Sequence, residues 1–293
     1  MARTLRARAP DPGTITKPHV LIFGPPGVRK TWETLGFHKL YYIDTEGGAE
    51  LPAYQERLKA GGGAYMGKAQ GSQDFATVID EIQALATVQH DYLTLAIDSF
   101  SKLYNLAAAA AEERVGNDFG KDKKEAQKPT RQLVSWLERL DLNVILICHQ
   151  KPIWVRHGKE LVQEGHTFDA WDKMEYDLHL CLQVSLQGDK SFATPTKSRM
   201  EGFPKGQRFP WTFAEFEARA GSALMLRPPK SIELPTKEEV AEVRRLLGIV
   251  KVPEDWESKV LAKAGVVSWE DMDRDKVRAS IKHLSGMVQP EAA

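Results

Sequence analysis

The chain has 293 residues, about twice the usual domain length, which predicts one substantial domain with a smaller appendage. Hydrophobic residues make up 42% and charged residues 27%, proportions that argue against collagen-like, coiled-coil and wholly disordered chains. Forty basic and forty acidic residues give no net charge, so any contact with a nucleic acid must come from local basic segments.

The sequence indicates a cytoplasmic protein. No stretch approaches the roughly 20 apolar residues of a membrane helix, and the N-terminus lacks the apolar segment of a secretory signal, so no membrane partner is expected. The two cysteines, Cys148 and Cys181, lie far apart in apolar runs, which predicts buried reduced thiols.

The first half of the chain has the pattern of an α/β domain. Residues 1–17 are rich in arginine and proline and predict a flexible basic arm. An apolar run from Val20 ends in a Gly-Pro-Pro-Gly turn, as expected of a strand buried on both faces. Similar runs follow at residues 40–43, 93–97 and 144–148, and amphipathic helices are predicted at residues 75–88 and 131–140. This alternation predicts a mostly parallel sheet between helices.

The character of the sequence changes after Gln150. A polar, loop-like stretch extends to about residue 172, and edge strands with hairpins are predicted at residues 178–186 and 191–195. A proline-rich linker, residues 227–235, separates a core domain, residues 18–226, from a small helical module, residues 236–293. A capping-box pattern of Thr236 and Glu239 begins that module, and its further helices are predicted at residues 256–264 and 274–284.

The strongest motif is an eight-residue stretch made up of Gly24, Pro25, Pro26, Gly27, Val28, Arg29, Lys30 and Thr31. It follows a predicted strand and precedes a predicted helix, the context of a phosphate-binding loop. In such a loop backbone N–H groups surround the phosphates of ATP, Lys30 reaches the β- and γ-phosphates, and Thr31 ligates Mg²⁺. The alternative is an ordinary Gly/Pro turn between a strand and a helix.

Arg29 departs from the usual pattern of that loop, which has glycine at this position. Its Cβ and long cationic side chain would either strain the loop or add a positive charge near the nucleotide. Asp98 ends the apolar run at residues 93–97, where a carboxylate can hold Mg²⁺, although a strand-ending Asp is also common in turns and caps. Ser99 follows it, so no acidic base lies directly after Asp98.

The segment Ile43-Asp44-Thr45-Glu46 resembles the second core strand of RecA-like recombinases, including RadA. The resemblance implies that Glu46 orients and deprotonates the attacking water. The run ending at Gln150 resembles the strand that ends in a γ-phosphate-sensing residue. The stretch around Lys197 and Arg199 resembles the region whose cations reach the nucleotide of a neighbouring subunit, which implies a head-to-tail filament or ring. The alternatives are that Glu46 is a solvated turn residue, that Gln150 is a capping residue, and that Lys197 and Arg199 are an ordinary surface pair.

The motifs in this order are similar to those of phage-encoded RecA-like ATPases of the single-strand annealing type, over about residues 18–220. That resemblance implies a RecA-like P-loop ATPase core that binds single-stranded DNA and hydrolyses ATP, with DNA stimulation, in recombination or repair. Two alternatives remain open. One is a non-hydrolysing annealing scaffold impaired by Arg29, and the other is an AAA-type motor or helicase loader that acts on a protein partner.

Two basic segments match the positions of the family's two disordered DNA-facing loops. The first, residues 112–131, contains Arg114, Lys121, Lys123, Lys124, Lys128 and Arg131. The second, residues 151–173, contains Lys151, Trp154, Arg156 and Lys159. Cations would neutralise phosphates and the tryptophan could stack on a base, giving sequence-independent binding of single strands. The alternative is two solvated charge runs.

Two remaining features concern metals and partners. His149, His157 and His166 lack the spacing of a zinc site, so no zinc is assigned. The C-terminal tryptophans, Trp256 and Trp269, either recruit a single-strand-binding protein or DNA, or form the core of their own module.

Overall fold

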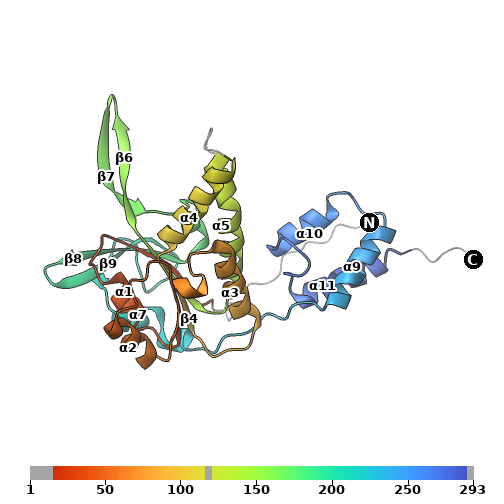
Figure 1. The fold of residues 1–293 in the computed structure, drawn as a ribbon, viewed down its shortest axis with the longest axis horizontal. Helices are drawn as coiled ribbons and strands as arrows, with labels where there is room; N and C mark the ends of the chain where they lie inside the picture. The colour runs from red at the N-terminus through yellow and green to blue at the C-terminus, as the bar shows by residue number, and fades with distance from the viewer. Residues whose placement is uncertain (1–15, 116–120, 289–293) are drawn as a thin grey trace, which may run out of the picture.

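The computed structural model describes residues 16–115 and 121–288, with only the backbone described at residues 115 and 121–128. An α/β core holds a large sheet between helices, a hairpin projects from the core, and a group of helices lies at the C-terminal end (Figure 1). The expected α/β fold with C-terminal helices is therefore confirmed. The arm predicted at residues 1–17 lies mostly outside the described residues.

The central sheet contains β1 (His19–Phe23), β2 (Leu40–Asp44), β3 (Ala64–Met66), β4 (Thr94–Asp98), β5 (Asn143–Cys148), β8 (Leu180–Gln187), β9 (Lys190–Ser198) and β10 (Phe209–Pro210). Their order across the sheet is β10-β9-β8-β1-β5-β4-β2-β3. Neighbouring strands from β8 to β3 pair in parallel, whereas β9 pairs antiparallel with both β8 and β10, which confirms a mostly parallel sheet. The prediction that the segment forming β8 lies at an edge is wrong, because β8 pairs with both β1 and β9.

Alternate side chains of β1 explain why the sheet is covered on both faces. Val20 and Ile22 pack into one hydrophobic layer, and Leu21 and Phe23 into the other. The layer on the Leu21 face includes α3 (Phe75–Thr87), α4 (Phe100–Val115) and α5 (Lys121–Arg139). The opposite layer includes α2 (Pro52–Ala60), α7 (Phe213–Ala220) and α8 (Ser222–Met225), together with Leu35 at the end of α1 (Lys30–Thr34). Two short pieces, η1 (Lys68–Gln70) and α6 (Met174–Asp177), lie in connections.

The prediction of a loop at residues 112–131 is wrong for the part of that segment that the structure describes. Helix α4 continues to Val115, and α5 already covers residues 121–131, so the helix predicted at residues 131–140 is the C-terminal half of a longer one. The run 121–128 is rich in lysine, with glutamate, alanine and glutamine, which are all good helix formers. Its polarity therefore does not interrupt the helix.

The prediction of a loop-like stretch after Gln150 is also wrong. It forms a two-stranded antiparallel hairpin of β6 (Gln150–His157) and β7 (Glu160–Phe168), called the projecting hairpin below (Figure 1). Most of its side chains are exposed. Since neither face of the hairpin is buried in the core, its strands lack the alternating apolar pattern by which a strand is usually predicted. The turn itself is supported by Gly158, whose φ of 65° suits glycine.

The C-terminal helical module consists of α9 (Lys237–Ile249), α10 (Trp256–Ala264) and α11 (Arg274–Ser285), and it has its own hydrophobic core. The predicted capping box is confirmed, with Thr236 and Glu239 each accepting from the other's backbone N–H. Trp269 is only 1% exposed, and Trp256 stacks on it with ring centroids 6.4 Å apart. The tryptophans thus form the core of the module.

The segments at both ends of the core domain pack against it. Lys17 is buried and its Nζ donates to the carbonyl oxygen of Arg227 at 2.5 Å, so the core includes Lys17. In the linker, Ile232 donates its N–H to Ala86 of α3 at 2.7 Å. Both cysteines are free and buried, as predicted. Within the described ranges, none of the helices has the length and apolar character needed to span a membrane.

Candidate nucleotide site

The sheet topology gathers most of the predicted nucleotide-site residues at the carboxyl ends of the parallel strands. From β1 the chain crosses over two neighbouring positions to β2, so that β5 and β4 lie between these strands. In parallel sheets, the crevice beyond the carboxyl ends of strands at such a crossover is the usual ligand site. A pocket of about 880 Å³ lies there and is lined by all of residues 24–31 together with Glu46, Asp98 and Gln150.

Lys30 lies within the curve of the phosphate-binding loop. Its Nζ donates to the carbonyl oxygens of Gly24 at 2.7 Å and Pro25 at 2.8 Å. Burial lowers the pKa of Lys30, and the nearby carboxylates of Asp98 and Glu46 oppose that shift. The ammonium group is thus directed at the pocket by the loop rather than extended into solvent.

Arg29 shows why the loop pattern has glycine at its position. Its backbone is left-handed, with φ 64° and ψ 25°, a conformation that costs a residue with a Cβ about 1–2 kcal/mol. The side chain is exposed at the pocket, and within the described part of the chain it has no hydrogen bond or ion pair. The guanidinium therefore borders the pocket without filling it.

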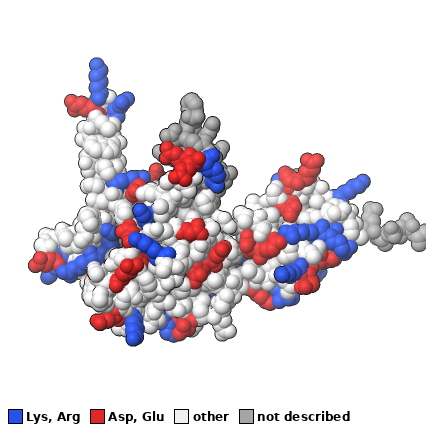
Figure 2. All heavy atoms as spheres, viewed as in Figure 1, with Lys and Arg blue, Asp and Glu red and all other residues white. Residues whose placement is uncertain are grey.

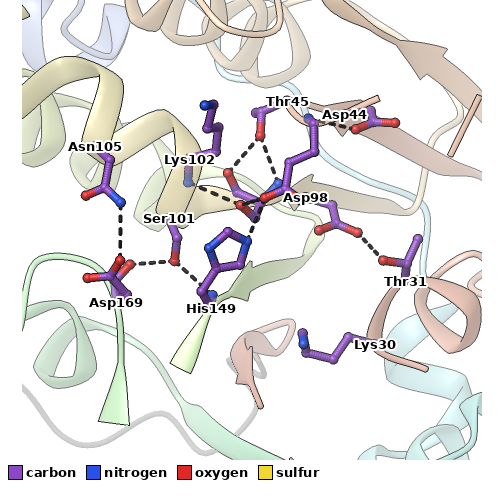
Figure 3. Close-up of polar contacts among 12 residues, drawn as sticks. Lys30, Thr31, Asp44, Thr45, Asp98, Ser101, Lys102, Asn105, His149 and Asp169 are labelled. Atoms are coloured by element: carbon purple, nitrogen blue, oxygen red, sulfur yellow. Dashed lines mark hydrogen bonds and ion pairs between the residues drawn. The ribbon is translucent and has the colours of Figure 1, made fainter. Parts of the chain in front are cut away.

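Thr31 and Asp98 form the candidate metal centre. The hydroxyl of Thr31 donates to Oδ2 of Asp98 at 2.5 Å (Figure 3). The hydroxyl of Tyr42 donates to the same oxygen at 2.6 Å. Burial raises the pKa of Asp98, and both hydrogen bonds oppose that shift. Hydroxyl and carboxylate oxygens are the ligands that Mg²⁺ prefers, so these residues fit the ion. Tyr42 was not predicted, because its apolar neighbours indicate only a core position.

Glu46 is held in the pocket by the loop after β2. The buried carboxylate of Asp44 accepts the N–H groups of Glu46 at 3.0 Å, Gly47 at 2.7 Å and Ala49 at 2.9 Å, which folds this loop back on itself. Oε1 of Glu46 accepts from the hydroxyl of Ser99 and lies 2.7 Å from Nε2 of His149. Glu46 is therefore not simply a solvated turn residue. Asp44 was part of the motif, but its organising role was not predicted.

His149 and Gln150 lie where β5 ends and β6 begins, and both line the pocket. The sequence identified Gln150, which lines the pocket, and its role as a γ-phosphate sensor stays a prediction. His149 was considered only as a metal ligand, and its contact with Glu46 depends on β5 and β2 flanking the same strand, β4. No sequence signal links two residues so far apart.

Lys197 and Arg199 do not line this pocket. They lie at and just beyond the end of β9, where Nζ of Lys197 donates to the carbonyl of Leu178 and Nη2 of Arg199 donates to that of Tyr176 at 2.6 Å. Burial, with a smaller effect of Arg199, lowers the pKa of Lys197. Their action on a neighbouring subunit's nucleotide stays a prediction.

The candidate DNA-binding residues lie on the projecting hairpin and on the helices α4 and α5. Trp154, Arg156 and Lys159 are exposed on the projecting hairpin, and Lys151 at its base pairs with Asp172 at 3.1 Å. Arg114 and Arg131 line a different pocket, between α5 and the helical module. The side chains of Lys121, Lys123, Lys124 and Lys128 lie outside the described residues. The adjoining ends of α4 and α5 project on the same side of the core as the hairpin (Figure 1).

Comparison with solved structures gives weak similarities. The RadB recombinase is 18% identical with a TM-score of 0.42, covering 73% of this chain and 90% of that one. The assembled ATPase EscN of the enteropathogenic E. coli type III secretion system, in complex with its central stalk EscO, is 13% identical with a TM-score of 0.38, covering 98% and 75%. No curated protein matches the sequence significantly.

A family model described as an AAA domain (AAA_24) matches residues 16–206, well over half of the chain. The matched segment contains the phosphate-binding loop and all strands of the sheet up to β9, so it includes the whole pocket. The chain therefore belongs to this AAA domain family and is a P-loop NTPase.

Proposed function

We propose that this P-loop NTPase hydrolyses ATP with Mg²⁺ and couples hydrolysis to binding of single-stranded DNA by the projecting hairpin. The observation that carries the proposal is the meeting of Lys30, the Thr31–Asp98 pair and Glu46 in one pocket. The hairpin leaves that pocket at Gln150. A change at the nucleotide therefore has a short path to the hairpin.

The chain's own residues account for the chemistry as follows. Lys30 and the backbone N–H groups of the loop bind the β- and γ-phosphates. Mg²⁺, held by Thr31 and Asp98, would neutralise phosphate charge. Glu46 orients a water molecule and takes up its proton as the water oxygen bonds to the γ-phosphorus. The bond between the γ-phosphorus and the bridging oxygen then breaks, and ADP leaves with that oxygen.

DNA binding is supported by the two unlike faces of the hairpin. Because paired residues share a face and successive residues alternate, Trp154 and Arg156 lie on one face with Leu161 and Gln163. Glu160 and Glu164 lie on the other face, where Glu164 pairs with His157 at 2.5 Å. The Trp154 face combines an aromatic ring with a cation and bears no carboxylate at these pairs, which suits stacking bases and phosphates.

The charges of the hairpin gather at its far end. Figure 2 shows basic and acidic side chains at the tip and a largely uncharged shaft. Because the tip carries both positive and negative charges, it gives little net attraction to a polyanion such as DNA. Affinity for DNA would therefore rest on stacking and on a few phosphate contacts, with weak sequence preference.

Phosphate release and binding of a fluorescent oligo-dT strand test the proposal together. Glu46→Gln should reduce hydrolysis at least about a hundredfold while leaving nucleotide affinity intact, since it removes only the base. Replacing residues 153–164 by a two-residue turn should abolish DNA binding and its stimulation of hydrolysis. Unchanged hydrolysis in the first variant would contradict the role of Glu46. Unchanged DNA binding in the second would contradict the role of the hairpin.

We extend the proposal to a head-to-tail assembly acting in phage-type DNA annealing or recombination, in which Lys197 and Arg199 serve the next subunit's nucleotide. Their position outside the chain's own pocket supports this arrangement. Each of the variant proteins Glu46→Gln and Arg199→Ala should hydrolyse ATP poorly by itself. Mixing the two proteins should restore hydrolysis, because some interfaces then combine an intact Glu46 with an intact Arg199. No restoration would argue against action between subunits. A single-strand-binding protein remains a further candidate partner of the C-terminal module.

The left-handed backbone of Arg29 favours one second candidate, a non-hydrolysing annealing scaffold. In that case the chain would bind ATP and DNA but release no phosphate, with or without DNA. An AAA-type motor on a protein partner would instead be stimulated by that protein and not by oligo-dT.

A further inference from the structure

The geometry points to His149 as a latch that holds Glu46 until the projecting hairpin moves. This inference rests on the proposed function, because it takes Glu46 as the base that activates water. It adds a regulatory contact to the same site and assigns it to a positioning residue that the sequence motifs do not identify.

The first observation is that two donors meet on a single oxygen of Glu46. Nε2 of His149 lies 2.7 Å from Oε1, and since a carboxylate only accepts, this nitrogen carries the hydrogen. The hydroxyl of Ser99 donates to the same oxygen, and Ser99 Oγ itself accepts the N–H of Lys102 at 3.1 Å. Both lone pairs of Oε1 are thereby engaged, and none is left for water on this oxygen.

The second observation is that the backbone of His149 is tied to both ends of the hairpin. Gln150, the next residue, begins β6, and Asp169, which follows β7, donates its N–H to the carbonyl of His149 at 2.8 Å. Ser101 of α4 closes the connection, because its Oγ accepts the N–H of His149 at 2.9 Å and donates to the carbonyl of Asp169 at 2.5 Å (Figure 3). Asn105 holds the Asp169 carboxylate at 3.2 Å.

These two observations give a short mechanical path. A ligand that shifts the hairpin relative to α4 moves the backbone of His149 and withdraws its imidazole from Glu46. Oε1 then regains a free lone pair, and the carboxylate can turn toward water. Within the described residues the side chain of Gln150 makes no hydrogen bond, so His149 is the side chain that physically joins hairpin and base.

The test compares His149→Ala with His149→Gln, whose amide nitrogen reaches about as far as Nε2. Without DNA, His149→Ala should raise kcat for ATP hydrolysis on the order of fivefold, the effect of losing one charge-assisted hydrogen bond at a half-exposed site, with KM unchanged. His149→Gln should stay near the parent rate. Affinity for a fluorescent non-hydrolysable ATP analogue should be equal in all three proteins, which separates release of the base from altered binding.

Ser101→Ala tests the connection to the hairpin. It removes the clamp but keeps the contact between His149 and Glu46, so the basal rate should be unchanged and oligo-dT affinity retained, while stimulation by oligo-dT is lost. An unchanged or reduced basal kcat in His149→Ala would overturn the latch. Stimulation that survives in Ser101→Ala would overturn its control by the hairpin.

The outcomes separate this inference from the proposed function. If Glu46→Gln still hydrolyses ATP, the base has been misassigned and the proposed chemistry fails. If Glu46→Gln is inactive and the two His149 variants behave like the parent, only the latch fails. If oligo-dT does not stimulate the parent but His149→Ala is faster, the latch holds and the DNA coupling fails.

Discussion

The hydroxyl of Thr31 donates to Oδ2 of Asp98 at 2.5 Å, although 67 positions separate the two residues in the sequence. The contact exists because β1 and β4 end at the same edge of the sheet with only β5 between them. Tyr42, from β2, completes the arrangement from the other side of Asp98. Side chains from α1 and β2 thus converge on one buried carboxylate at the end of β4.

Asp98→Asn should reduce Mg²⁺-dependent ATP hydrolysis at least about a hundredfold, because it removes the negative charge that would hold the ion. Nucleotide affinity measured with EDTA should change little, since Lys30 and the loop are untouched. Isothermal titration with and without Mg²⁺ would check this. Asp91→Asn is the matched control, as this exposed carboxylate pairs only with Lys39 among the described contacts. Equal rates in the two variants would argue against a metal role for Asp98.

Arg29→Gly should stabilise the protein by about 0.5–1 kcal/mol, since relief of the left-handed strain exceeds the added flexibility of glycine in the unfolded chain. Arg29→Ala removes the guanidinium but keeps the strain, so it should not share this gain. Urea unfolding of both variants would show the difference. Turnover that rises only in Arg29→Gly would identify loop strain as the impairment, whereas turnover that falls in both would identify the guanidinium as useful.

Trp154→Ala should weaken binding of oligo-dT at least about fivefold, the usual effect of losing one stacked base. Arg156→Gln should instead lower the slope of log affinity against log salt by about 0.7–1, as expected for one phosphate contact. Fluorescence anisotropy at several salt concentrations measures both. Val162→Ala, on the opposite face of the hairpin, is the control. Equal weakening by all three would indicate loss of the hairpin fold.

Stability should fall when the pH drops below 6.5, because of His19. Burial, with the neighbouring His179, lowers the pKa of His19 from 6.5 to about 4. The native imidazole stays neutral while the unfolded one takes up a proton, so between pH 7.5 and pH 5 the free energy of unfolding should decrease by about 2 kcal/mol. Urea unfolding of His19→Leu should show a smaller decrease, in which only the part due to the lowered pKa of His179 remains, whereas the exposed-site variant His38→Asn should keep all of it. The same decrease in His19→Leu would exclude His19 as its source.

Trp269→Ala should destabilise the helical module by about 3–5 kcal/mol, because it empties the centre of that module's core. Hydrolysis should persist, since the two cores that surround the sheet contain none of the same residues. Limited proteolysis should release a fragment ending near the linker. Val267→Ala, at a side chain 67% exposed, should have no such effect. Loss of hydrolysis in Trp269→Ala would show that the ATPase core depends on the module.

The sequence alone determined the elements whose pattern arises locally. Continuous apolar runs predicted the strands around the pocket, because a strand buried on both faces needs apolar residues at successive positions. The loop motif predicted Lys30, Thr31 and the odd position of Arg29, since the spacing of phosphate ligands along one turn is itself local. The projecting hairpin and the start of α5 were missed for the opposite reason. Their polar side chains face solvent or one another and not the core. A polar sequence alone therefore does not distinguish a loop from an exposed strand or helix.

Only the tertiary structure decided which of these residues touch. The order of strands brings Asp98 to Thr31 and places His149 between the hairpin and Glu46, and neither contact leaves a trace in residue spacing. Asp44 and Tyr42 sit in an apolar strand, yet their buried polar groups organise the pocket. The physical reason is that hydrogen bonds between distant residues depend on sheet order and register, which emerge when the whole core packs.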